Sequence, residues 1–485
     1  MLDVINDFLS GRVLIPLVLG LGTYFTIRSR FVQLRYFAHM ISVLRDCSPT
    51  GNRHLSSLQA LTLSLAGRVG TGNIVGVGIA VSMGGPGAVF WMWMTALLGM
   101  SSSFFECTLG QLYKRCDENG QYRGGPSWYI QHGLGKRWLG IIAAFLLLVT
   151  FGFAINGLES HAVSHSLNDA FGLSTSWSGL ALSLLLGTVF MGGIKRIAAV
   201  ADLLVPLKVI AYVGVTLYVI VLQIDQVPGA LISIVKSAFG LDQAFGGLVG
   251  SAIIMGVRRG VFSNEAGLGS APNVACAAKV AHPIAQGVVQ AFSVFIDTIV
   301  ICTCTALIIL LSGFYTPGFE GDGITLAQNS LAEVVGDWGR MFISVVLALF
   351  VFTAMLYNYY LGENSLRFII AAPRKSLIAY RLLVLMLVFW GAIEDLSTVL
   401  AFADITMTLL ALVNLIAMAL LFKVCMRVLD DYDEQRRAGT RTPVFNSSKF
   451  RDLDIDLMAW PAVPTPLPPT SPVCAVRAPA KAKLT

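Results

Sequence analysis

The chain has 485 residues, of which 55% are hydrophobic and 13% are charged, whereas a soluble domain carries about 25% charged residues. Apolar blocks of roughly 20 residues, the length that spans the hydrocarbon core of a bilayer, recur along it, so the composition excludes an ordinary soluble domain. The formal net charge of +6 does not indicate a nucleic-acid partner, because Lys and Arg gather in alternate loops and form no stripe with interleaved aromatic side chains.

The apolar blocks predict an all-α integral membrane protein with about eleven transmembrane helices. An extra helix stands at the N-terminus, and the ten that follow divide into two sets of five, residues 58–223 and residues 245–422. Five is an odd number, so the two sets cross the membrane in opposite directions and form an inverted repeat. We expect one membrane transport domain over residues 1–427. Its spans are residues 13–27, 58–83, 87–112, 138–163, 176–192, 197–223, 245–278, 284–312, 341–370, 378–393 and 397–422.

The first span of the first repeat is interrupted in its middle by residues 66–76, which read AGRVGTGNIVG. Glycine weakens a helix and an arginine is costly at membrane depth, so this segment is a poor continuous helix. Taken alone, the cluster fits close packing between helices as well as it fits a break. A dinucleotide-binding loop is excluded because no strand–helix–strand unit surrounds the glycines.

Residues 256–269, GVRRGVFSNEAGLG, interrupt the first span of the second repeat in the same way. Broken helices at matching positions of an inverted repeat are typical of a transporter's binding site at the centre of the membrane. The N–H groups freed at a break suit a substrate carboxylate, and the freed carbonyl oxygens suit a cation such as Na⁺. The sequence therefore predicts a secondary transporter with two broken helices.

The charges in the loops set the expected orientation. Arg and Lys follow the first, third, fifth and ninth spans, and the opposite loops are poor in cations and hold Asp and Glu. The positive-inside rule then places the N-terminus outside and the C-terminus in the cytoplasm, at a plasma membrane that in a bacterium is the inner membrane. The tail, residues 428–485, begins charged and becomes rich in proline, so we expect it to be unpacked.

Other classes of function find less support in the residues. A channel would need a continuous polar pore or a filter motif, and a membrane enzyme would need a cluster of catalytic groups in a loop; neither is recognisable in the sequence. Glu159, His161 and His165 lack the fourth ligand that a structural zinc site requires. No cofactor and no obligate protein partner are indicated, so the expected partners are a small substrate, its coupling ion and the lipid bilayer.

Three long motifs occur in order along the chain. They are GTGNIVGVGIAVSMGGPGAVFWMWMTALLGM at residues 70–100, RGVFSNEAGLGSAPN at residues 259–273 and FIDTIVICTCTALIILLSG at residues 295–313. Together they resemble the alanine or glycine:cation symporter family. The resemblance implies the leucine-transporter fold and Na⁺-coupled symport of a small neutral amino acid such as alanine or glycine. H⁺ is the alternative coupling ion.

The resemblance also implies roles for particular residues. Thr353 would ligate Na⁺ together with the backbone oxygens of Ala66 and Val69. The substrate-binding positions implied at the two breaks are Thr71, Gly72, Asn73, Phe262, Ser263 and Asn264.

Two positions depart from the residues that members of this family commonly carry. Glu159 stands in place of a glutamine and Asn358 in place of a tryptophan. Both are expected to face the substrate, so substrates larger or more polar than alanine, such as glutamine or serine, come into consideration. Glu159 could bind the substrate's ammonium group, stay protonated, or pair with a buried arginine such as Arg68. Asp297 could belong to an ion route or pair with an arginine such as Arg258.

Overall fold

The computed structural model describes residues 8–45, 54–241, 249–316, 319, 322–370, 373–394 and 396–461. Within these ranges helices make up nearly the whole structure, with one two-stranded antiparallel sheet, which confirms the all-α prediction. The elements, with η for short 3₁₀- or π-helical segments, are η1 Leu9–Leu14, α2 Ile15–Arg28, α3 Val32–Arg35, α4 Phe37–Arg45, α5 Ser57–Arg68, η2 Gly72–Gly76, α6 Val77–Gly84, α7 Gly87–Leu112, β1 Arg115–Cys116, β2 Tyr122–Arg123, α8 Pro126–Leu134, α9 Arg137–Val149, η3 Thr150–Ala154, α10 Ile155–Phe171, α11 Thr175–Phe190, α12 Gly193–Leu222, η4 Ile224–Gln226, α13 Val227–Ala238, α14 Val249–Asn264, α15 Ala271–Ala275, α16 Pro283–Val294, η6 Phe295–Cys302, α17 Thr303–Leu311, α18 Gly323–Val335, α19 Trp338–Ile370, α20 Arg374–Gly391, α21 Leu396–Arg437 and η7 Ser447–Phe450.

Six of the described helices are long and apolar enough to cross a membrane, and a seventh span results if α5 and the helix Gly72–Gly84 are taken as one bent span. The shorter apolar helix α11 stands where a span was expected at residues 176–192. The total of eleven spans stays a prediction. Large apolar side chains cover the outside of the bundle, a surface that is stable in lipid and unfavourable in water. On α12 those more than half exposed are Leu203, Leu207, Ile210, Leu217, Tyr218 and Val221.

The first predicted interruption is a break in the helix. α5 begins with a capping box, in which Ser56 and Gln59 exchange side-chain to backbone hydrogen bonds, and it ends at Arg68. Val69 leaves helical geometry, with φ −80° and ψ 80°, and the chain resumes as η2 and α6 at an angle of 53°. Carbonyl oxygens at the end of α5 and N–H groups at the start of the next helix are thereby released from the helical ladder.

The second interruption is a break with left-handed backbone. α14 ends at Asn264, whose Oδ1 accepts a hydrogen bond from the N–H of Ala266 at 3.0 Å. Glu265 follows with φ 53°, and Gly267 and Gly269 have φ 85° and 78°. Because side chains with a Cβ are strained in this region, the backbone of the break requires glycine at the last two positions.

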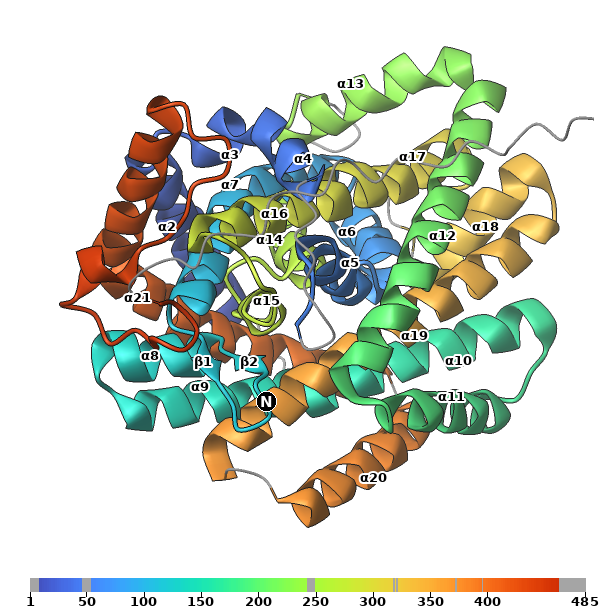
Figure 1. Cartoon of the computed structure of the whole chain (residues 1–485). Helices are drawn as coiled ribbons and strands as arrows, with labels where there is room; N and C mark the ends of the chain where they lie inside the picture. The colour runs from blue at the N-terminus through green and yellow to red at the C-terminus, as the bar shows by residue number, and fades with distance from the viewer. Residues whose placement is uncertain are drawn as a thin grey trace, which may run out of the picture.

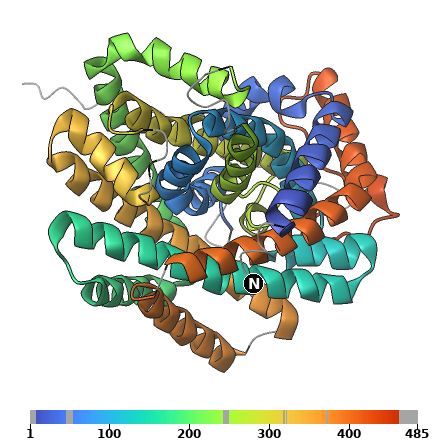
Figure 2. The same ribbon diagram turned by 180° about the vertical axis from the view of Figure 1, so that it is seen from behind.

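The two breaks meet at the centre of the molecule. Figure 1 shows α5, α14 and α15 surrounded by the other helices, and the same central group is visible from behind in Figure 2. A Cβ on Gly72 would lie only 2.8 Å from the Cα of Ser263, so glycine lets the two broken helices approach this closely. The inverted repeat thus brings its two irregular segments together.

The C-terminal tail packs onto the bundle. We call residues 438–461, which follow α21, the C-terminal strap. Its aromatic residues Phe445, Phe450 and Trp460 are at most 5% exposed. Trp460 Nε1 donates a hydrogen bond to the backbone oxygen of Gln111 at 2.9 Å, which fastens the strap to the end of α7.

The prediction of an unpacked tail is therefore wrong for residues 428–461. Residues 428–437 continue α21, and the aromatic side chains of the strap supply enough apolar surface to hold the rest against the protein. Residues 462–485, which include the proline-rich segment, lie outside the described residues, as do residues 245–248 at the expected start of the second repeat.

Candidate substrate and ion site

A buried carboxylate lies where the two breaks meet. Asp297, in η6, is fully buried. Its side-chain oxygens accept hydrogen bonds from Asn73 Nδ2 at 2.7 Å, Ser263 Oγ at 2.9 Å and Thr298 Oγ1 at 2.7 Å. We call these four residues the Asp297 cluster. Because Asn73 belongs to the first break and Ser263 to the second, one acid joins the two repeats.

The Asp297 cluster has the chemistry of a cation site. Among the described residues no cationic nitrogen lies within ion-pair distance of Asp297, so the considered pairing with an arginine such as Arg258 is not formed. A charged carboxylate at this depth needs a compensating charge. Carboxylate and hydroxyl oxygens, ligands that a hard cation prefers, are present here, whereas the Asn73 amide turns its nitrogen to Asp297 and its oxygen to the N–H of Gly70.

A second polar group faces Gly70 of the first break. Glu159, on α10, and Asn358, on α19, are 3% and 1% exposed. Asn358 Nδ2 donates to Glu159 Oε2 at 3.0 Å and to Asn156 Oδ1 at 3.3 Å. A Cβ on Gly70 would lie 2.9 Å from Glu159 Oε1, so the missing side chain leaves the carboxylate beside the backbone of the break. We call Asn156, Glu159 and Asn358 the Glu159 cluster.

Glu159 is not paired with an arginine in this structure. The guanidinium of Arg68 donates instead to Ser103 Oγ at 2.9 Å, and Glu159 accepts from the Asn358 amide. Glu159 and Asn358, the two positions at which the resemblance implied a departure from the usual residues, are in direct contact. Together they give one side of the first break a polar lining.

The oxygens predicted to ligate Na⁺ are occupied by a lysine. Lys208, on α12, is fully buried, and its Nζ donates to Val69 O at 2.7 Å and to Thr353 Oγ1 at 2.6 Å. Thr353 Oγ1 in turn lies 3.4 Å from Ala66 O. The sodium site expected at Ala66, Val69 and Thr353 stays a prediction; in this structure the ammonium group lies on two of its oxygens and repels a second cation from them. We call Lys208, Val69 and Thr353 the Lys208 cluster.

Three further residues were predicted to bind the substrate, and the structure places only some of them near the first break. Thr71 is 3% exposed and begins the helix after the first break, where N–H groups lack helical partners. Phe262 lies against Gly72, since a Cβ there would be 3.1 Å from its ring. Asn264 belongs to none of the three clusters; its Oδ1 accepts a hydrogen bond from the N–H of Ala266 inside the second break.

No role was predicted for Lys208 from the sequence, although its position is unusual. One lysine stands in the middle of the span expected at residues 197–223, where lipid offers an ammonium group no partner. Its partners Val69 and Thr353 are 139 and 145 positions away in the sequence. No local spacing could have identified them.

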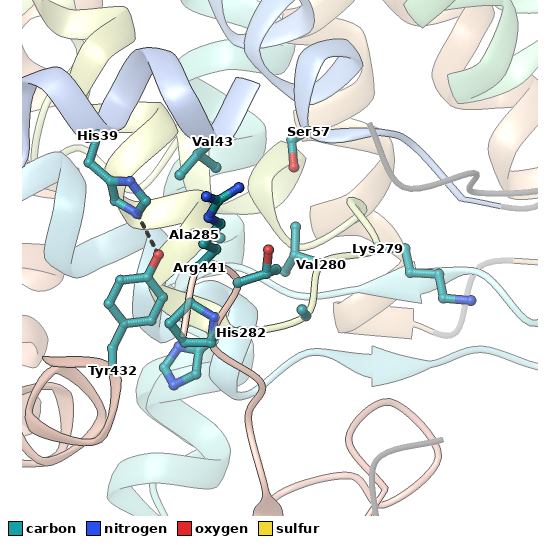
Figure 3. Close-up of a pocket in the computed structure, with 12 residues that line it drawn as sticks. His39, Val43, Ser57, Lys279, Val280, His282, Ala285, Tyr432 and Arg441 are labelled. Carbon is teal, nitrogen blue, oxygen red and sulfur yellow. Dashed lines mark hydrogen bonds between the residues drawn. The ribbon is translucent and has the colours of Figure 1, made fainter. Parts of the chain in front are cut away.

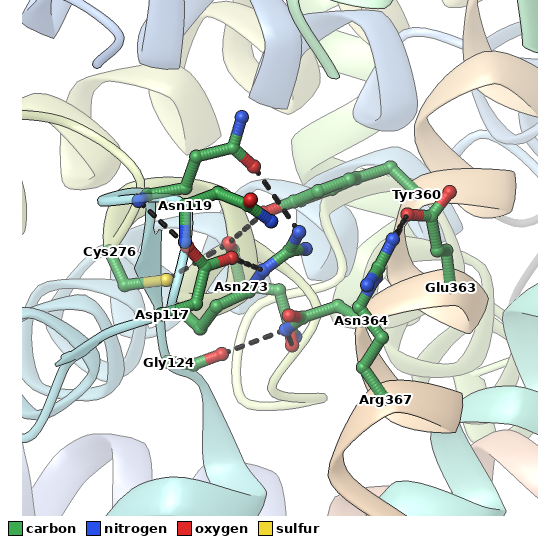
Figure 4. Close-up of polar contacts among 11 residues, drawn as sticks. Asp117, Asn119, Gly124, Asn273, Cys276, Tyr360, Glu363, Asn364 and Arg367 are labelled. Atoms are coloured by element: carbon green, nitrogen blue, oxygen red, sulfur yellow. Dashed lines mark hydrogen bonds and ion pairs between the residues drawn. The ribbon is translucent and has the colours of Figure 1, made fainter. Parts of the chain in front are cut away.

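Contacts between the two repeats close the region that holds the three clusters at both of its ends. At one end Asn364 Nδ2, on α19, donates to the backbone oxygen of Gly124, in the turn between β2 and α8, at 2.9 Å and to Asn273 Oδ1 at 2.8 Å (Figure 4). At the other end α18 begins directly against α6, where a Cβ on Gly78 would overlap the backbone of Gly323. The closure agrees with the low exposure of all three clusters.

A separate pocket lies beside the C-terminal strap. It is lined by residues that include His39, His282, Tyr432 and Arg441, and His39 Nε2 lies 2.7 Å from the Tyr432 hydroxyl (Figure 3). Burial and the nearby Arg436 lower the pKa of His39 to about 4, so this imidazole is neutral at pH 7. No residue of the three clusters lines the pocket, so it is distinct from the candidate site.

An apolar helical bundle with two broken helices around buried polar groups defines a secondary transporter of the leucine-transporter type. The crystal structure of MhsT in complex with L-phenylalanine is similar in fold, with a TM-score of 0.55 and 13% sequence identity over 76% of this chain and 90% of that chain. The model of the sodium:alanine symporter family matches residues 1–447, and the chain belongs to this family.

Two relatives are similar over almost their whole length. The chain is 45% identical to the probable sodium/glutamine symporter GlnT of Bacillus subtilis (strain 168), over 95% of this chain and 96% of that protein. It is 43% identical to the amino-acid carrier protein AlsT of the same organism, over 93% and 96% respectively. The resemblance inferred from the motifs is thereby confirmed, and the protein belongs to the sodium-coupled amino-acid carriers and not to the enzymes.

Proposed function

We propose that this protein carries a small neutral amino acid into the cell together with Na⁺ by alternating access. The observation that carries the proposal is the meeting of the two broken helices around Asp297, a buried acid whose partners are an amide and two hydroxyls. The first break touches all three clusters: Val69 through its carbonyl, Gly70 through its missing side chain and Asn73 through its amide. A substrate and an ion bound here affect one another's binding.

The carboxylate of the amino acid fits the start of the helix after the first break. There the N–H groups near Thr71 and Gly72 carry the partial positive charge of a helix N-terminus. The ammonium group of the same substrate then faces Glu159. Asn358, hydrogen-bonded to Glu159, offers an amide to a polar side chain such as that of glutamine or serine, and Phe262 forms an apolar wall against Gly72. The name of GlnT supports glutamine within the range that also includes alanine and glycine.

Na⁺ fits the Asp297 cluster better than the site first expected for it. Asp297 and Ser263 supply oxygens, and rotation of the Asn73 amide would add a third. An ion here lies close to a substrate carboxylate at Gly72, so the binding of each favours the other. H⁺ is the alternative coupling ion, because a proton on Asp297 would compensate the same charge.

Alternating access requires the two closed ends to open in turn. Asn364 of the second repeat contacts Gly124 of the first, and Gly323 of the second repeat contacts Gly78 of the first. Rocking one repeat against the other would break one of these contacts while keeping the other.

We place the protein in the plasma membrane, which in a bacterium is the inner membrane, with the N-terminus outside and the C-terminus in the cytoplasm. The basic loops support this orientation. A single cysteine at Glu118, in the hairpin after α7, should react with an impermeant thiol reagent only after the membrane is permeabilised. Reaction in intact cells would reverse the orientation.

Uptake by the purified protein in liposomes tests the proposed transport. Radiolabelled alanine, glycine, serine and glutamine are offered with an inward gradient of Na⁺, of H⁺ or of neither, and we expect the Na⁺ gradient to drive accumulation. Asp297→Asn should raise the Na⁺ concentration for half-maximal uptake by about tenfold or more, because it removes the charge of the ion site. Asp225→Asn, at an exposed aspartate of η4, should leave it unchanged. Accumulation that follows the H⁺ gradient and ignores Na⁺ would contradict the proposal.

A further inference from the structure

Lys208 places a positive charge at the centre of the protein without an acidic partner. It lies near the middle of α12, a helix of 30 residues, and its side chain is fully buried. Among the described residues no carboxylate lies within ion-pair distance of its Nζ. A buried ammonium group is costly at membrane depth, so its hydrogen-bond partners must account for its presence.

Oxygen atoms from both repeats surround the Lys208 ammonium. Nζ donates to Val69 O at 2.7 Å and to Thr353 Oγ1 at 2.6 Å, and Phe350 O lies at 3.5 Å. The ring of Phe350 also lies 4.9 Å from Nζ, within the range of a cation–π contact. Three donors thus have three oxygen neighbours and an aromatic face.

These oxygens attract a cation for a reason that does not depend on lysine. Val69 caps the C-terminal end of α5, where released carbonyls carry the partial negative charge of the helix dipole. Thr353 adds a hydroxyl from α19, in the other repeat. The same oxygens are the ones at which the family resemblance implied Na⁺, and here they accept hydrogen bonds from an ammonium group of the chain itself.

We propose that the Lys208 ammonium is a tethered cation that takes the place of a transported ion on the oxygens of Val69 and Thr353, leaving one Na⁺, at Asp297, to accompany each substrate. This inference rests on the proposed function, because it assigns the ions of the same transport cycle. Lys208 holds α5 to α19 whether or not Na⁺ is bound.

The number of Na⁺ ions that cross with each substrate tests this inference. Purified wild-type protein in liposomes should move one Na⁺ per amino acid when fluxes of radioactive sodium and substrate are measured together. Lys208→Ala frees the oxygens of Val69 and Thr353, so the ratio should rise to two and the dependence of uptake on Na⁺ should become sigmoidal. Adding Thr353→Val to Lys208→Ala removes one ligand and should return the ratio to one.

Two further variants serve as controls. Lys236→Ala, at an exposed lysine of α13, should keep the wild-type ratio. Lys208→Met removes the charge but keeps most of the volume, so it should leave no space for a second ion and the ratio should stay at one. If Lys208→Ala does not transport, Na⁺ binding is measured from the thermal stabilisation that NaCl gives relative to choline chloride in detergent. That curve should fit two sites in the variant and one in the wild type.

The outcomes separate the two proposals. A wild-type ratio of two, or an unchanged ratio and Na⁺-binding curve in Lys208→Ala, would overturn the tethered cation and leave Na⁺-coupled symport standing. Wild-type uptake that does not respond to Na⁺ would overturn the proposed function itself.

Discussion

Glu159 is held in the interior by an amide and not by a cation. Asn358 Nδ2 reaches its Oε2 at 3.0 Å, and Gly70 leaves its Oε1 beside the first break. A carboxyl group in this position is available to the ammonium group of a bound amino acid or to a proton. We expect the group that Glu159 binds to decide which substrates are accepted and how uptake responds to pH.

Glu159→Gln should change the ranking of substrates. Uptake of the preferred amino acid at low concentration should fall roughly ten- to a hundredfold, because a hydrogen bond to a charged group contributes about 1.5–3 kcal/mol. Competition by unlabelled amino acids in liposome uptake measures the ranking, with Glu118→Gln, at an exposed glutamate, as the control. An intact ranking with lower thermal stability in detergent would instead assign Glu159 a structural role.

Individual residues were predictable where a motif contained them. Asn73 and Ser263 were named from the motifs at the two breaks, and the structure joins both to Asp297. Thr353 was expected beside the carbonyl oxygen of Ala66, and its hydroxyl lies 3.4 Å from that atom. The cation that it contacts is the Lys208 ammonium. A lysine whose partners are more than a hundred positions away leaves no pattern in the sequence, so the occupant of that site required the fold.

The two broken helices are the elements that the sequence predicted best, because glycine and charge are conspicuous in the middle of an apolar span. The short helix η6, which carries Asp297, was not predicted. In a span whose residues are nearly all apolar, a π-helical segment has no residue pattern of its own, so its position depends on packing.

Gly269→Ala should destabilise the second break. Gly269 has φ 78°, and a Cβ there would also overlap the ring of Pro126, so we expect a loss of about 1–3 kcal/mol. Gly214→Ala is the matched control in the interior of α12, where a Cβ meets no atom within 4 Å. That change should be neutral or stabilise by up to about 1 kcal/mol. Thermal unfolding in detergent compares the two, and equal melting temperatures would show that the break tolerates a side chain.

At the scale of the whole molecule, the C-terminal strap ties the last helix of the second repeat to the first repeat. Trp460 bonds the backbone of Gln111, Lys114 lies 4.2 Å from the Trp460 ring, and Arg115 forms an ion pair with Asp454 at 2.7 Å. The aromatic residues of the strap are too widely spaced to register as a hydrophobic segment. For this reason composition alone predicted an unpacked tail.

Trp460→Ala should release the strap. Loss of a buried tryptophan costs about 3–5 kcal/mol, which exceeds what the remaining contacts of so short a segment are expected to supply. Limited proteolysis should then cleave the strap faster than in the wild type. Trp177→Ala, at a tryptophan of α11 that is 71% exposed, should leave cleavage unchanged. Equal protection in both variants would mean that the polar contacts alone hold the strap.

The Lys208 ammonium on Val69 and Thr353 also limits how far the carrier can concentrate its substrate. A tethered charge returns with the empty protein, so it draws no work from the ion gradient. With one Na⁺, a tenfold sodium gradient contributes about 1.4 kcal/mol and a potential of about 100 mV contributes about 2.3 kcal/mol. Together these sustain a roughly 500-fold accumulation of a neutral amino acid, and a second ion would square that limit. In exchange, the rate at low sodium falls with the first power of the sodium concentration and not with its square, which suits uptake from a sodium-poor medium.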